Sequence, residues 1–124
     1  MSRARSFLEQ IALAGAARHR RRWLARNFTR AEARAFARRP DQSVAAALAL
    51  KRAAMRLFAE ICPEKAFAAR SFRITHTRRG APRLAAFPSL PGVPSRSLKR
   101  RLHVSASHTS TTAVGLVVYA GGDE

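Results

Sequence analysis

The sequence predicts a small α+β domain in which helices pack on a mostly antiparallel sheet. Residues 42–61 repeat apolar side chains with a helical period. Residues 102–107 alternate between apolar and polar and are followed, after a short polar connection, by the largely apolar stretch 111–119, which is typical of a β-hairpin. A chain of 124 residues suffices for one domain with a modest core, so we treat 1–124 as a single domain.

The predicted hairpin has one amphipathic arm and one apolar arm. Leu102, Val104 and Ala106 point to one face of the first arm, and polar residues point to the other. The second arm is apolar on both faces, as expected of a strand covered on both sides. His108 stands at the connection, where two strands would hold it rigidly in contact with solvent. This position suits a ligand contact, and a polar turn without a further role is the alternative.

The N-terminal segment is expected to form a helix over residues 6–26. Phe7, Ile11 and Ala14 would share one stripe of this helix. Residues 18–22 are all basic, which is more than the favourable effect of cations at a helix C-terminus requires.

Thr29 and Glu32 have the spacing of a capping box. They predict a second helix that ends near Arg39, because Pro40 follows.

The helix over 42–61 carries an apolar arc that spans about half of its circumference. Lys51 falls inside this arc, and the simplest interpretation is a lysine whose stem packs while its amine reaches solvent. Arg52 and Arg56 lie one turn apart at the edge of the arc, where a solvated face is the simplest interpretation.

A second, shorter hairpin is expected after the long helix. Residues 71–77 alternate like a strand, a turn follows around Gly80, and residues 83–87 would return. His76 lies within the first of these strands and is interpreted as structural. Residues 95–101 are expected to be a basic connector to the main hairpin.

The charge of the chain is extreme for its size. Twenty-four Lys and Arg residues face seven Asp and Glu residues, which gives a formal net charge of +17. This balance predicts an acidic partner, such as nucleic acid, a polyphosphorylated ligand or an acidic protein. Cys62 is the only cysteine, so no disulfide can form within the chain, and a cytoplasmic location is expected. No membrane span is expected either.

Several kinds of chemistry find no support in the residues. The four histidines and the single cysteine do not have the spacing of a zinc site. The carboxylates are too few and too scattered for paired acid–base catalysis. The sequence also contains no Walker loop and no dinucleotide fingerprint.

Four motifs stand in one order along the chain: Phe28-Thr29-Arg30-Ala31-Glu32, Lys51-Arg52-Ala53, Gly80-Ala81-Pro82 and Ser105-Ala106-Ser107-His108-Thr109. In this order and spacing the chain resembles the 4′-phosphopantetheinyl transferases, especially the short holo-acyl-carrier-protein synthase type. The resemblance is strongest over residues 22–120. It implies the fold of that family, a role in fatty acid biosynthesis, and transfer of phosphopantetheine from coenzyme A to a serine of an acyl carrier protein.

The resemblance also implies site residues. Lys51 and Arg56 would bind phosphate, and His108 would contact the phosphates or ribose of coenzyme A, the donor substrate. Arg18, Arg21 and Arg22, within the basic run, would dock the acidic acyl carrier protein. Members of this type form homotrimers with active sites between subunits, so a homotrimer is an expectation for this chain.

The chain departs from the family at the magnesium ligands. Arg52 stands where the family has a magnesium-binding Glu, and the opening segment lacks the Asp of the family's Gly-x-Asp strand, with Glu9 the only nearby acid. An arginine cannot replace a hard oxygen ligand. No metal ligand is therefore assigned, no residue is assigned a catalytic role, and both an active transferase and a degenerate member that only binds coenzyme A or carrier protein remain open. The alternative function is a basic nucleic-acid-binding or ribosome-associated protein, which would explain the charge directly.

Overall fold

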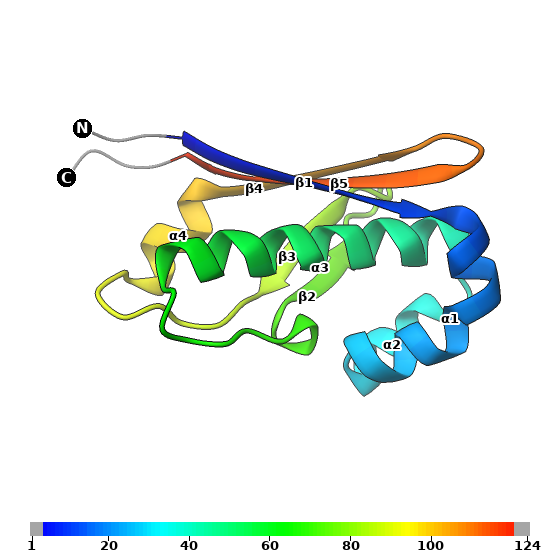
Figure 1. Cartoon of the computed structure of the whole chain (residues 1–124), viewed down its shortest axis with the longest axis horizontal. Coiled ribbons are helices and arrows are strands. Elements are labelled where there is room, and N and C mark those ends of the chain that lie inside the picture. Colours follow the sequence, from blue (N-terminus) through cyan, green and yellow to red (C-terminus); the bar gives the residue numbers. More distant parts are fainter. Residues whose placement is uncertain (1–3, 121–124) are drawn as a thin grey trace.

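The computed structural model describes residues 4–120 and shows helices packed on one face of a three-stranded antiparallel sheet (Figure 1). The elements follow one another as β1 (Ala4–Ala12), α1 (Leu13–Asn27), α2 (Arg30–Phe36), α3 (Asp41–Ile61), the short 3₁₀ helix η1 (Ala69–Ser71), β2 (Arg73–His76), β3 (Pro82–Ala86), α4 (Ser95–Arg101), β4 (Leu102–His108) and β5 (Thr112–Ala120). The predicted α+β fold class is confirmed.

The main sheet has the strand order β1-β5-β4, and β2 pairs with β3 in a separate two-stranded sheet. The predicted main hairpin is confirmed, since β4 pairs with β5 from Leu102 opposite Tyr119 to His108 opposite Ala113. The predicted shorter hairpin is also present, with Gly80 in its turn at a φ of 90°.

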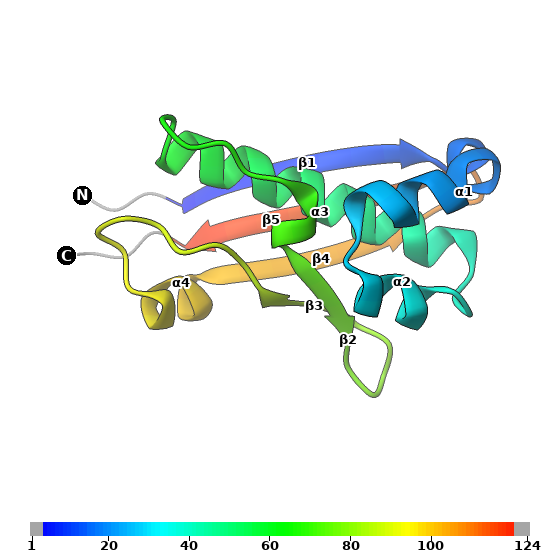
Figure 2. The same ribbon diagram turned by 90° about the horizontal axis from the view of Figure 1, so that it is seen from below.

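Helix α3 crosses one face of the main sheet and forms the centre of the core (Figure 2). Its apolar arc is buried as the periodicity predicts, and residues such as Leu48, Leu57 and Phe58 are fully inaccessible to solvent. Gly115 of β5 makes the closest approach between the two layers, because a Cβ atom there would lie only 2.5 Å from the amide nitrogen of Leu50. A glycine at this position therefore sets the distance between sheet and helix.

The expectation of one helix over residues 6–26 is wrong for its first half. Ala4–Ala12 is strand β1, which pairs with β5 along its whole length, from Ala4 opposite Ala120 to Ala12 opposite Thr112. Phe7 and Ile11 are four residues apart, so they fit one stripe of a helix and also one face of a strand. Hydrogen bonding to the apolar strand β5 decides in favour of the strand.

The basic connector over 95–101 is helix α4 in the structure. Leu98 is fully buried and fixes this helix to the core, while basic side chains such as Lys99 and Arg100 remain exposed. One apolar residue among so many charged ones leaves no periodicity from which a helix could be predicted.

The face of the main sheet opposite α3 carries no other element of residues 4–120 (Figure 1). We call it the open face. Leu8 of β1 and Val114, Leu116 and Val118 of β5 form its apolar centre, and Leu8 is 48% exposed. The apolar second face of β5 was expected to be covered, and within the described residues it is not.

No helix between residues 4 and 120 is long and apolar enough to cross a membrane.

Candidate functional site

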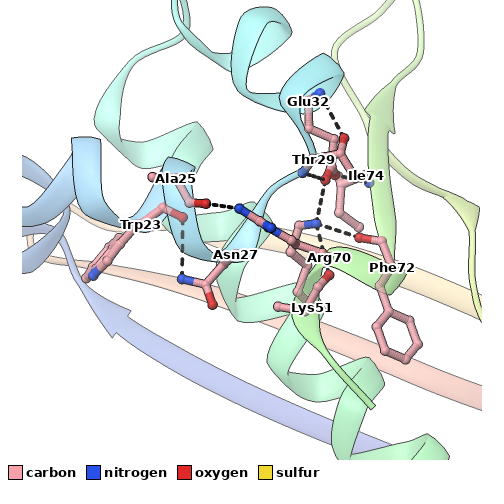
Figure 3. Close-up of polar contacts among 10 residues, drawn as sticks. Trp23, Ala25, Asn27, Thr29, Glu32, Lys51, Arg70, Phe72 and Ile74 are labelled. Carbon is pink, nitrogen blue, oxygen red and sulfur yellow. Dashed lines mark hydrogen bonds and ion pairs between the residues drawn. The ribbon is translucent and has the colours of Figure 1, made fainter.

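Lys51 and Glu32 form a buried ion pair at the centre of the domain (Figure 3). The Lys51 ammonium donates to Glu32 Oε1 at 2.7 Å and to the carbonyl oxygens of Phe72 at 2.6 Å and Ala69 at 3.2 Å. It also lies 4.6 Å from the centre of the Phe28 ring, within the range of a cation–π interaction. The ammonium therefore joins α3 to α2, η1 and the start of β2.

Glu32 reaches this position because it belongs to the predicted capping box, which is confirmed. Thr29 Oγ1 accepts from the Glu32 amide at 3.1 Å, and Glu32 Oε1 accepts from the Thr29 amide at 2.9 Å. The second carboxylate oxygen accepts from the amide of Ile74 at 2.7 Å. One carboxylate thus caps α2, pairs with a lysine and binds the backbone at the start of β2.

The surroundings of Lys51 differ from those of a phosphate ligand. All three N–H donors of an ammonium are used within the chain, and the side chain is fully buried. Burial lowers the pKa of Lys51, and the hydrogen bond and charge of Glu32 oppose this shift. The expectation that the amine reaches solvent is wrong, and we leave Lys51 out of the ligands proposed below.

Arg52 and Arg56 lie on the exposed flank of α3 that faces β1. Arg56 Nη1 donates to Glu9 Oε2 at 2.6 Å and to the carbonyl oxygen of Leu8 at 3.4 Å. Its guanidinium lies 4.9 Å from the centre of the Phe7 ring. Arg52 is exposed one turn before Arg56, and no ion pair of residues 4–120 involves it. We call Glu9, Arg52 and Arg56 the arginine flank.

The arginine flank does not fit a magnesium ion. Glu9 is its only carboxylate, and Arg56 occupies that carboxylate at 2.6 Å. Magnesium needs several hard oxygen ligands, and two neighbouring guanidinium groups would repel it. Across the described part of the chain, no three His, Cys, Asp or Glu side chains come together as a metal site.

His108 ends β4 and lines a cavity of about 200 Å³ at the other flank of α3. Gln42, Ser43 and Ala47 of α3 line the same cavity, together with His76 from β2. Burial and the charge of Arg39 both lower the pKa of His76, so its ring is neutral near pH 7. His76 also packs edge-on against Phe36 at 5.3 Å, in line with the structural role expected of it.

His108 and Arg56 do not meet within one chain. His108 lies beside residues 42–47 at the start of α3, and Ala47 and Arg56 are nine positions apart, about 13.5 Å along the helix axis. They also face opposite edges of the sheet, since Arg56 contacts β1, His108 belongs to β4 and β5 lies between. A ligand that contacts both would need a second copy of the chain or a long reach.

The basic run at the middle of α1 has two roles. Arg20 donates from Nη2 to the carbonyl oxygens of Phe36 and Arg39, both at 2.6 Å, and forms an ion pair with Asp41 at 2.9 Å. Arg20 thereby supplies hydrogen-bond donors to carbonyl oxygens at and just beyond the C-terminal end of α2. Arg18, Arg21 and Arg22 remain exposed and line a shallow hollow along α1 together with His19 and Ala25.

Sequence reasoning missed two features of these sites. It named Glu9 only as the nearest acid and did not foresee its contact with Arg56, because the segment was expected to be helical. It also did not connect His76 with His108, which are 32 positions apart in sequence. The available signal was that each of these histidines is followed directly by a threonine.

The chain matches no protein-family model and no curated protein sequence. Solved structures match over almost its full length. A holo-(acyl-carrier-protein) synthase from Bacillus anthracis, in complex with CoA (3′,5′-ADP), is 18% identical with a TM-score of 0.69, and the match covers 95% of this chain and 96% of that one. The Neisseria meningitidis holo-[acyl-carrier-protein] synthase is 20% identical with a TM-score of 0.68, covering 95% and 97%.

A third similar structure is the holo-[acyl-carrier-protein] synthase of Helicobacter pylori in complex with coenzyme A. It is 15% identical, its TM-score is 0.64, and the match covers 95% of this chain and 100% of that one. The chain therefore has the fold of the holo-acyl-carrier-protein synthases, as its motifs predict. The comparisons give no support to the nucleic-acid alternative.

Proposed function

We propose that this protein binds coenzyme A and an acyl carrier protein on the holo-acyl-carrier-protein synthase fold. The observation that carries the proposal is the match over almost the whole chain to synthases, including two solved with coenzyme A or a CoA-derived ligand. The four motifs stand in the order that the resemblance implies, and the positive charge suits a ligand with a diphosphate and a 3′-phosphate.

The reaction of the family would move phosphopantetheine to a carrier serine. The serine oxygen would bond to the phosphorus that bears pantetheine, the bond from that phosphorus to the bridging oxygen would break, and 3′,5′-ADP would leave while the serine proton passes to solvent. We propose that magnesium-dependent transfer is slow or absent here, because the arginine flank does not offer metal ligands. The lone buried Cys62 agrees with the cytoplasmic location that forms part of this proposal.

The coenzyme A site is proposed to include Arg56 and His108 from different subunits. Replacement of either residue by Ala should weaken coenzyme A binding by about 1–3 kcal/mol, the usual range for hydrogen bonds to charged groups. Isothermal titration calorimetry measures this change. His19→Ala, on α1, is the matched control and should bind like the parent. Unchanged affinity in both Arg56→Ala and His108→Ala would show that the site lies elsewhere.

The open face is proposed as the surface through which copies of the chain associate into a homotrimer. Soluble monomers rarely expose a contiguous apolar surface such as that of Leu8, Val114, Leu116 and Val118. Leu116 is central, since it lies opposite Leu8 on one side and Ser105 on the other.

We therefore expect light scattering to give the mass of three chains for the parent and of one chain for Leu116→Lys, because a buried unpaired ammonium opposes association. The monomeric variant should also lose coenzyme A affinity. Ala59→Lys, at an exposed position of α3, is the control and should remain trimeric. A parent protein that is monomeric at micromolar concentration would contradict this assembly.

The acyl carrier protein is proposed to dock on α1. Arg18, Arg21 and Arg22 point away from the core along one side of the helix, whereas Arg20 is committed to the end of α2. Guanidinium groups bind carboxylates in a bidentate manner, which suits an acidic partner helix.

A further inference from the structure

We propose that the arginine flank is a metal-independent site for the diphosphate of coenzyme A. This inference rests on the proposed function and concerns how the same site neutralises its ligand. In place of a cation held by carboxylates, the chain presents two guanidinium groups, Arg52 and Arg56, one helical turn apart.

The first argument is that Arg56 is held in place before any ligand arrives. Glu9 Oε2 accepts from its Nη1 at 2.6 Å, and the Phe7 ring lies 4.9 Å from the guanidinium carbon. Both hydrogen bonds of Arg56 use Nη1, which leaves the N–H groups of Nη2 and Nε for a ligand. Glu9 is thus a positioning residue that orients a phosphate-binding group.

The second argument is the charge of the flank. Arg52 has no ion-pair partner among residues 4–120, and the carboxylate of Glu9 offsets Arg56, which leaves one net positive charge. The next charged pair along β1 and α3 is Arg5 with Glu60, at 3.3 Å, and its two charges offset each other. A divalent cation would be repelled by this arrangement, and a diphosphate would be attracted.

The third argument is chemical. A guanidinium presents paired N–H donors that match two oxygens of a phosphate, so two guanidinium groups on one helix flank can bind adjacent phosphates. Arginine clamps also stabilise charge on transferring phosphoryl groups, which is the task that magnesium performs elsewhere. The flank can therefore bind the diphosphate without a metal.

The test is calorimetric titration of the full chain with inorganic pyrophosphate and with coenzyme A, each in EDTA and in excess magnesium chloride. We expect both ligands to bind in EDTA, with coenzyme A affinity unchanged or lower in magnesium. Arg52→Ala should lower the affinity for both ligands roughly 10- to 100-fold, as expected for loss of a charged hydrogen bond. Dephospho-coenzyme A keeps the diphosphate, so its affinity should fall by the same factor in Arg52→Ala. Pantetheine, which has no diphosphate, should not bind through this site.

Two further variants sharpen the result. Arg38→Ala removes an exposed arginine from the region after α2 and should bind like the parent. Arg52→Glu should abolish binding in EDTA, and its thermal unfolding midpoint should match that of the parent because the position is exposed.

The outcomes separate the two proposals. Coenzyme A binding that requires magnesium would overturn the inference and leave the proposed function intact. Pyrophosphate binding that depends on Arg52, without any binding of coenzyme A, would support the anion site and refute the proposed function. Absence of binding by both ligands in EDTA would overturn the inference.

Discussion

Replacement of Lys51 by Met is expected to lower the free energy of unfolding by about 3–5 kcal/mol, the range observed when one partner of a buried ion pair is removed. The substitution leaves the Glu32 carboxylate, which is 3% exposed, without its cation. It also deprives the carbonyl oxygens of Phe72 and Ala69 of their donor. Urea denaturation followed by circular dichroism measures the change.

Two comparisons test the explanation. Lys65→Met, at an exposed position, should change stability by a few tenths of a kcal/mol. Lys51→Met combined with Glu32→Gln should recover part of the loss, because no uncompensated charge then remains in the interior. If Lys51→Met unfolds at the same urea concentration as the parent and only loses coenzyme A binding, the lysine is a ligand and the structural account is wrong.

Replacement of Gly115 by Ala is expected to destabilise the protein by about 3 kcal/mol, at the upper end of the range for overpacking. The new Cβ would lie 2.5 Å from the Leu50 nitrogen and 2.8 Å from the carbonyl carbon of Ala49. These atoms are backbone in the middle of α3, so relief requires the helix and the sheet to separate.

Gly15→Ala is the matched control for this substitution. Its Cβ would meet only the Trp23 ring, at 3.3 Å, and that half-exposed side chain can move. The gain in helix propensity is about 1 kcal/mol and offsets the cost of moving the ring. The free energy of unfolding should therefore stay near that of the parent. Equal thermal unfolding midpoints for Gly115→Ala and the parent would refute the close packing of β5 on α3.

Local patterns were sufficient to predict the hairpin of β4 and β5, the capping box at Thr29 and helix α3, because each rests on residues near one another in sequence. The same approach failed at β1. Phe7 and Ile11 are compatible with both periods, and the pairing with β5 that decides between them joins residues 100 or more positions apart.

The sequence supplied candidate site residues one by one, but it did not supply their geometry. Position in an apolar arc marked Lys51 as unusual, yet its partners Glu32 and Phe72 come from other elements. Strand order separates Arg56 from His108, and this order cannot be read from either segment alone. The resemblance supplied candidate ligands, and the three-dimensional contacts decide which of them are free to bind.

The central claim, that this chain is a coenzyme A-binding protein, is tested most directly by one calorimetric titration in EDTA. Coenzyme A is titrated into the parent chain, and a short single-stranded oligonucleotide of similar charge is titrated under the same salt conditions. The account predicts saturable binding of one coenzyme A per chain, with the oligonucleotide weaker and unsaturated. Saturable binding of the oligonucleotide with no binding of coenzyme A would contradict it and favour the nucleic-acid alternative that the net charge of +17 allows.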